Sequence, residues 1–104
     1  MKDLRQLNIE LYDYLRENHV GAKKAVSSFK LEAVFNLQGT QIRKAVNALR
    51  ICGYPICSDR NGYYFAKNKN EVQKTIAQLN SRTQKINDAK KGLSKSIAFI
   101  KPLA

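Results

Sequence analysis

Apolar side chains recur at helical spacing at the start of the chain. Leu4, Leu7, Leu11 and Leu15 stand three or four residues apart, which is the spacing of one face of an α-helix. Asp3, with Gln6 three residues later, is typical of a helix N-terminal cap. Asn18 readily takes the left-handed conformation that ends a helix. The pattern predicts an amphipathic helix over residues 3–18.

Two shorter helices are predicted in the middle of the chain. Residues 20–27 show no period and are interpreted as a loop. Ser28 suits the N-cap of a short helix that Asn36 ends with a positive φ. Thr40 suits the N-cap of the next helix, which Gly53 ends. The apolar positions of these helices are Leu31, Val34 and Phe35 in the first and Ile42, Ala45, Val46 and Leu49 in the second.

After Gly53 the apolar period changes from that of a helix to two. Residues 54–58 and 63–66 are rich in aromatic and branched side chains, which favours two strands. Residues 59–62 between them end in Asn61-Gly62. This dipeptide is the strongest short-range signal of a β-hairpin, because both residues accept a positive φ.

The last segment has the clearest periodicity in the chain. Asn70 suits its N-cap, Gly92 is a point at which it kinks or ends, and Pro102 prevents its continuation. Steps of four and three alternate, and their average of 3.5 residues is the coiled-coil period. Thr83 and Lys90 are the polar exceptions. The stripe consists of Val72, Ile76, Leu79, Thr83, Ile86, Lys90, Leu93, Ile97 and Ile100.

Composition places the chain among soluble globular proteins of one domain. It has 104 residues, of which 43% are hydrophobic and 26% charged. Nineteen basic residues against eight acidic ones give a net charge of +11. Such an excess on a small domain favours a polyanionic partner. No acidic residue lies between Glu32 and Asp59, which suits a segment that lies against phosphates.

Several classes of protein are excluded by what the sequence lacks. No apolar run is long enough for a membrane span, and because the N-terminal stretch is polar we expect no signal peptide. Cys52 and Cys57 are too few for a disulfide scaffold, so we expect free thiols and a cytoplasmic location. His19 is the only histidine, and no nucleotide-binding or metal-binding motif occurs. We therefore expect no catalytic residues, metal, cofactor or small-molecule ligand.

The order helix, short helix, turn, helix, hairpin resembles a winged helix-turn-helix domain. Within it, Gln41-Ile42-Arg43, Val46, Leu49-Arg50, Gly53-Tyr54-Pro55-Ile56 and Gly62-Tyr63-Tyr64 are similar to the N-terminal DNA-binding module of biotin repressors. They also resemble small winged-helix proteins of phages and other mobile elements. The resemblance implies a mainly α fold with a β-hairpin. Residues 1–69 would form the winged helix-turn-helix domain, and residues 70–101 a long C-terminal helix.

In such folds the second helix of the motif enters the major groove of DNA. Asn and Gln pair with adenine there and Arg with guanine, while the hairpin tip reaches the backbone or the minor groove. The DNA-binding candidates are Thr40, Gln41, Arg43, Lys44, Asn47, Arg60, Asn61 and Lys67. Arg50 suits DNA contact and packing against the hairpin equally well. The tyrosines and phenylalanine of the hairpin region are expected to be half core.

The resemblance implies sequence-specific binding of double-stranded DNA, as a transcriptional regulator or an origin-binding accessory factor. A homodimer would form through Ile76, Leu79, Ile86, Leu93 and Ile97. In the alternative, the helix breaks at Gly92 and its last piece folds back on the same subunit.

Two other functions stay open at this point. Fold does not determine function, so one alternative is a protein-interaction module that binds an acidic replication or defence protein. The other is binding of single-stranded DNA or RNA.

Overall fold

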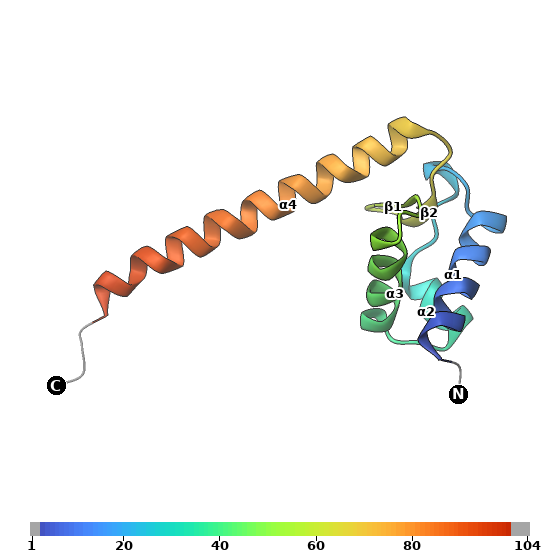
Figure 1. Cartoon of the computed structure of the whole chain (residues 1–104), viewed down its shortest axis with the longest axis horizontal. Coiled ribbons are helices and arrows are strands. Elements are labelled where there is room, and N and C mark those ends of the chain that lie inside the picture. Colours follow the sequence, from blue (N-terminus) through green and yellow to red (C-terminus); the bar gives the residue numbers. More distant parts are fainter. Residues whose placement is uncertain (1–2, 101–104) are drawn as a thin grey trace.

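The computed structural model describes residues 3–100, and Figure 1 shows a group of short elements from which one long helix projects. The short elements, residues 3–66, are called the body below. It is mainly helical with one two-stranded antiparallel sheet, as the sequence predicts. The elements are α1 (Leu4–Asn18), η1 (Ala22–Lys24), α2 (Ser28–Phe35), α3 (Gly39–Ile51), β1 (Ile56–Asp59), β2 (Gly62–Phe65), α4 (Lys69–Ser96) and η2 (Ile97–Phe99).

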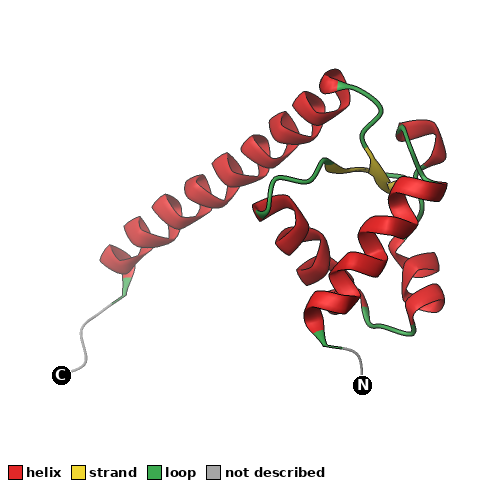
Figure 2. Ribbon diagram, turned by 45° about the vertical axis from the view of Figure 1, so that its right-hand side comes forward, coloured by secondary structure: helices red, strands yellow, loops and turns green. Residues whose placement is uncertain are grey.

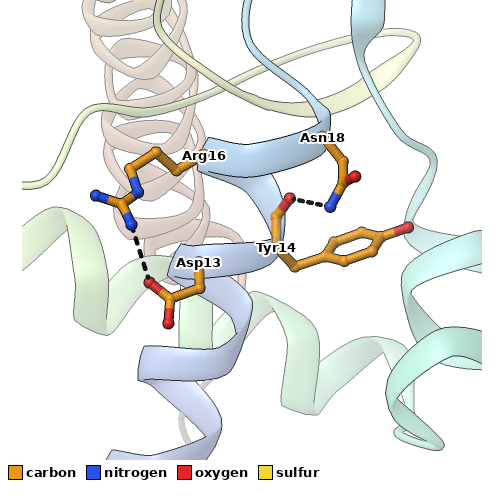
Figure 3. Close-up of polar contacts among 4 residues, drawn as sticks. All are labelled: Asp13, Tyr14, Arg16 and Asn18. Atoms are coloured by element: carbon orange, nitrogen blue, oxygen red, sulfur yellow. Dashed lines mark hydrogen bonds and ion pairs between the residues drawn. The ribbon is translucent and has the colours of Figure 1, made fainter.

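Helix α1 begins at the predicted cap but ends differently from the prediction. The Asp3 carboxylate accepts a hydrogen bond from the Gln6 backbone N–H at 2.9 Å. Asn18 remains helical, and its side-chain amide donates to the Tyr14 carbonyl at 3.0 Å (Figure 3). The predicted left-handed stop at Asn18 is therefore wrong. The chain leaves α1 through His19, whose φ of −135° lets its carbonyl accept from the Phe65 N–H at 2.8 Å.

A surface ion pair lies along α1, between Asp13 and Arg16 at 3.7 Å (Figure 3). Both side chains are about half exposed. An exposed pair of this kind contributes about 0–1 kcal/mol to stability. The helix is held instead by its apolar face.

Residues 20–27 are more ordered than the loop that the sequence predicts. Val20 forms a parallel bridge with Phe65, and Val26 an antiparallel bridge with Tyr63. The Val26 and Tyr63 backbones exchange two hydrogen bonds of 2.8 Å. A two-stranded hairpin leaves unpaired N–H and C=O groups along each edge, and this segment satisfies some of those of β2. Only two isolated residues of this segment pair with β2, so the segment does not show the apolar period of two that a strand would have.

Helices α2 and α3 are where the sequence predicts them, but their caps are shifted. The N-cap of α2 is Ser27 rather than Ser28, with the Ser27 hydroxyl accepting from the Lys30 N–H at 3.1 Å. The N-cap of α3 is Gln38 rather than Thr40. Thr40 lies inside the first turn of α3. The boundary differs because the chain enters each helix one or two residues earlier than the hydroxyl side chains suggest.

The turns between these elements have a positive φ at three of the predicted positions, Asn36, Gly53 and Gly62. Asn36 ends α2 with φ 54° and ψ 51°, which confirms the prediction. Gly53 follows α3 with φ 92°. Asn61 was expected to share this conformation, but Asn36 is the only non-glycine with a positive φ among residues 3–100. The Asp59 carboxylate instead caps the turn by accepting from the Asn61 N–H at 2.8 Å.

Gly62 is required by the close approach of two backbones. Its φ is 132°, and a Cβ atom there would lie 2.0 Å from the Val26 carbonyl oxygen. The missing side chain lets β2 pair with the segment before α2. In the hairpin itself, Ile56 stands opposite Phe65 and Asp59 opposite Gly62.

The core lies where α1, α2 and α3 meet one side of the hairpin (Figure 2). All four predicted apolar positions of α3 are buried. So are Leu11 and Leu15 of α1 and Leu31 of α2, whereas Val34 is exposed. Tyr64 and Cys57, on opposite strands of the hairpin, are also buried. The remaining buried apolar residues are Val26 and Ile56.

Helix α4 packs on the hairpin only with its first turns. Its N-cap is Asn68, two residues before the predicted Asn70, and the Asn68 side chain accepts from the Glu71 N–H at 3.0 Å. Thr75 is the only α4 residue that is fully buried. Its hydroxyl and the backbone of Ser58 lie 3.4–3.5 Å apart.

Helix α4 runs without a break through Gly92 to Ser96. The alternative in which it breaks there and folds back is therefore wrong, and Leu93 and Ile97 are exposed to solvent. A single glycine costs a helix only about 1 kcal/mol, which the flanking helix formers offset. Lys101 and Pro102, the predicted end of this segment, lie outside the described residues. Within residues 3–100, no helix is both long enough and apolar enough to span a membrane.

Candidate nucleic-acid interface

The outward face of α3 is polar and basic because its inward face is fully used by the core. Ile42, Ala45, Val46 and Leu49 point into the body, so the residues between them point out. The exposed side chains on this face are Thr40, Gln41, Arg43, Lys44 and Asn47. No carboxylate lies on α3.

A shallow groove of about 490 Å³ lies between this face, the hairpin tip and α4. It brings together four of the eight DNA-binding candidates, Arg43 and Asn47 from α3 and Arg60 and Asn61 from the hairpin tip. We call it the arginine groove. It is lined by Ser27, Ser28, Arg43, Val46, Asn47, Arg50, Ser58, Asp59, Arg60, Asn61, Gly62, Tyr63, Leu79 and Arg82.

Arg50 lines the arginine groove and joins α3 to the hairpin. Its Nε donates to the Ile56 carbonyl at 2.7 Å, and its Nη2 to the Ser58 hydroxyl at 3.1 Å. Of the two roles left open for Arg50, packing against the hairpin is thus observed. Burial lowers the pKa of the Arg50 guanidinium, and the nearby charge of Arg82 lowers this pKa further. An arginine stays charged under such shifts, so its positive charge remains in the groove.

The arginine groove carries a strong excess of positive charge. Its lining includes four guanidinium groups, on Arg43, Arg50, Arg60 and Arg82, and one carboxylate, on Asp59. Asp59 already accepts the Asn61 N–H that shapes the turn. Four like charges around one open groove repel one another, and an anion that enters the groove relieves this repulsion.

Arg82 is a member of this group that the sequence analysis did not single out. It lies on α4, outside the segments that resemble a winged helix-turn-helix. The signal that identifies it is its spacing from Leu79, which also lines the groove. Residues three apart lie on the same helix face, so a side chain that contacts the body brings the residue at i+3 toward it.

The other four candidates do not line the arginine groove. Thr40 and Lys44 are exposed elsewhere on α3. The Gln41 side-chain oxygen accepts from the Gln38 N–H at 2.9 Å, and Gln41 borders a separate depression beside Leu4 and Leu37. Lys67 lies where the chain enters α4, next to Gly21. Its backbone N–H donates to the Glu71 carboxylate at 2.7 Å.

The aromatic residues of the hairpin region serve mainly as packing. Tyr64 is buried, and the Tyr12 ring contacts Tyr54 at 4.7 Å and Phe65 at 5.7 Å between centroids. Tyr63 is half-buried and is the only aromatic side chain in the lining of the arginine groove. Phe65 is also half-buried against the core, and Tyr54 is 45% exposed, so one of the four rings is buried, where the sequence predicts half.

Both cysteines are free thiols, as expected, with Cys52 exposed and Cys57 buried. Burial raises the pKa of the Cys57 thiol, which therefore packs as a small neutral side chain. Among residues 3–100, no three His, Cys, Asp or Glu side chains come together as a metal-binding group.

Comparison of the chain with protein-family models, with curated proteins and with solved structures finds no match.

Proposed function

We propose that this protein binds double-stranded DNA through the arginine groove and the outward face of α3, with a preference for one base sequence. The observation that carries the proposal is the convergence of four arginines from α3, the hairpin and α4 around one open groove that has a single carboxylate. Nucleic-acid backbones supply the regularly spaced anions that such a surface attracts.

The arrangement of elements supports different roles for α3 and for the hairpin tip within this surface. An α-helix fits the major groove, where an arginine binds guanine and an asparagine binds adenine through two hydrogen bonds each. Arg43 and Asn47 stand one turn apart on α3, so both reach one short stretch of base edges. The hairpin tip with Arg60 lies beside α3 and reaches the flanking backbone, as the wing of a winged helix-turn-helix does.

The test starts from a bound sequence selected from a pool of random duplexes. Affinity for this duplex and for a scrambled duplex is then measured by fluorescence anisotropy across a salt series. Arg43→Ala or Asn47→Ala is expected to weaken binding of the selected duplex by about 1–3 kcal/mol and to relax the preference at one base pair. Arg60→Ala is expected to weaken the binding of both duplexes and to lower the salt dependence of the affinity.

Lys67→Ala is the matched control, because it removes one positive charge that lies away from the arginine groove. It is expected to change affinity much less than Arg60→Ala. The proposal fails if duplex DNA does not bind at low salt. It also fails if Arg43→Ala and Asn47→Ala leave affinity and sequence preference unchanged. Tighter binding to an unpaired oligonucleotide than to the duplex would point to single-stranded nucleic acid instead.

A further inference from the structure

Helix α4 carries its apolar stripe far beyond the body. The body contacts α4 only as far as Leu79 and Arg82, and every α4 residue from 83 to 95 is exposed. On this free part, Ile86 is 55% exposed and Leu93 73% exposed. Within α4, the a positions of the heptad are Ile76, Thr83 and Lys90, and the d positions are Val72, Leu79, Ile86 and Leu93. This is the pattern of a helix that pairs with another helix. Ile97 and Ile100 continue this spacing in the sequence, but they lie in and directly after η2.

The residues beside the stripe show what kind of helix it pairs with. The flanking e and g positions hold one charge, on Arg82, among otherwise neutral side chains: Gln73, Thr75, Asn80, Asn87, Ala89, Ser94 and Ser96. Apart from Lys90 on the stripe itself, the lysines beyond the first turn of α4 stand farther out, at Lys74, Lys85, Lys91 and Lys95. An acidic partner helix would find almost no charge to pair with beside the stripe. A second copy of the chain brings the same stripe and the same neutral flanks.

The body determines the direction in which two copies pair. It covers Thr75 and packs against Val72 and Leu79, at the N-terminal end of the stripe and on the same side of α4. In a parallel pair, both bodies would compete for space at one end. A parallel pair would also place Lys90 directly against its own copy, and like charges facing each other destabilise such a layer.

An antiparallel pair removes both conflicts. The two-fold axis then crosses the pair at the height of residue 88. Residue i of one chain lies level with residue 176 − i of its partner, so along the free part of α4 each a position packs against a d position. Lys90 faces the partner's Ile86, and Thr83 faces the partner's Leu93. The polar residues are thus covered by apolar ones, and the Lys90 stem packs along Ile86 with its ammonium group in water.

The same register covers the exposed C-terminal end. Ile97, the first residue of η2, comes level with the partner's Leu79, and Ile100 follows at the end of η2, close to the partner's body. Ile76 and Leu79 line a cleft of about 370 Å³ that also includes Tyr54, Pro55 and Val72. Ile97 and Ile100, at 72% and 73% exposed, are the side chains that would enter this cleft on the partner.

From these observations we infer that two copies of the chain form an antiparallel dimer through α4, centred on residue 88 and closed at each end by the C-terminal isoleucines. The two Leu79 residues then lie about 27 Å apart along the pair, at 1.5 Å per residue over 18 residues. The bodies stand at opposite ends, related by a two-fold axis. The inference does not depend on DNA binding.

The orientation is tested by disulfide pairing without DNA. Thr83→Cys and Leu93→Cys are made separately in the full chain with Cys52→Ser, which removes the exposed native thiol. One of the two proteins carries a mass tag. They are mixed at equal concentration in a glutathione redox buffer and analysed by mass spectrometry. The antiparallel register places residue 83 against residue 93, so we expect the mixed disulfide to exceed either self-disulfide at least tenfold.

A parallel pair gives the opposite result, because residue 83 then faces residue 83 and each variant links to itself. Predominant self-disulfides would therefore overturn the orientation. Sedimentation velocity on the unmodified chain tests the dimer itself. We expect a dimer that becomes monomeric with Ile86→Asp plus Leu93→Asp, both at exposed positions outside the body. A chain that is monomeric at every accessible concentration would overturn the inference whether or not it binds DNA.

Discussion

Helix α1 and the free half of α4 have similar sequence patterns and opposite surroundings. Both carry large aliphatic side chains three or four residues apart. In α1, Leu11 and Leu15 are 1% and 0% exposed, because α3 and the hairpin lie against them. In α4, the corresponding side chains beyond Leu79 stand in water. An amphipathic pattern therefore predicts which face of a helix seeks a partner, but it does not tell whether the partner belongs to the same chain.

The two helices also differ in how their polar residues interrupt the stripe. The buried face of α1 has no charged residue among its leucines, because an unpaired buried charge is costly. The stripe of α4 contains Thr83 and Lys90. Such residues are tolerated at the boundary between two chains, where they select register and orientation at some cost in stability. This contrast supports the proposal that α4 pairs with a second chain, whereas α1 packs in the core of the body.

The largest effect is expected from a matched pair of leucines, one in each region. Leu15→Ala removes a fully buried side chain and is expected to lower the free energy of unfolding by about 3–5 kcal/mol. Leu93→Ala is expected to leave the unfolding of the body unchanged and to weaken only the proposed association between chains. Urea unfolding at two protein concentrations measures both effects. An equal loss in the two variants would show that Leu93 packs within its own subunit.

The next effect concerns the glycine on which the hairpin depends. Gly62→Ala places a Cβ atom against the Val26 carbonyl and forces a non-glycine residue into φ 132°. We expect it to lower stability by about 2–3 kcal/mol. The control is Gly92→Ala, where a Cβ atom meets nothing within 4 Å and the helix gains about 0.5–1 kcal/mol. Thermal unfolding followed by circular dichroism measures both, and a neutral Gly62→Ala would contradict the close approach.

A smaller, pH-dependent effect is expected where the body meets α4. The Glu71 carboxylate accepts from the Ala22 N–H at 2.8 Å and from the Lys67 N–H at 2.7 Å. These two hydrogen bonds lower the pKa of Glu71. A carboxylate with a lowered pKa contributes stability above its unfolded pKa of about 4.3 and loses it as the pH falls through the folded value.

Glu71→Gln is the variant that measures this contribution. It is expected to be less stable than the unmodified chain at pH 7, with the difference shrinking as the pH falls from about 5 toward 3. Urea unfolding at several pH values measures the difference. A difference that stays constant over this range would mean that the charge of Glu71 contributes nothing and that its hydrogen bonds act through shape alone.

Local patterns in the sequence predicted the order and the type of the main elements. The burial of the α3 stripe followed from its period, and the left-handed Asn36 from its side chain. The caps were less accurate, at Ser28, Thr40 and Asn70. Several polar residues stand near each helix start, and only the path of the chain decides which of them has a free backbone N–H to cap.

The candidate site was predicted in part. Arg43, Asn47, Arg60 and Asn61 were named from the sequence, and the fold brings them to one groove. Arg82 was missed and Lys67 lies elsewhere, since their distances from α3 depend on how α4 crosses the hairpin. No local pattern contains that information.

The sequence by itself determined the helices, the hairpin, the basic charge and the apolar stripe of α4, because each depends on side chains a few residues apart. Tertiary structure alone decided the pairing of Val20 and Val26 with β2 and the hydrogen bond by which Arg50 joins α3 to the hairpin. These features depend on contacts between distant segments. Their energies come from burial and hydrogen bonds that exist only once the chain has folded.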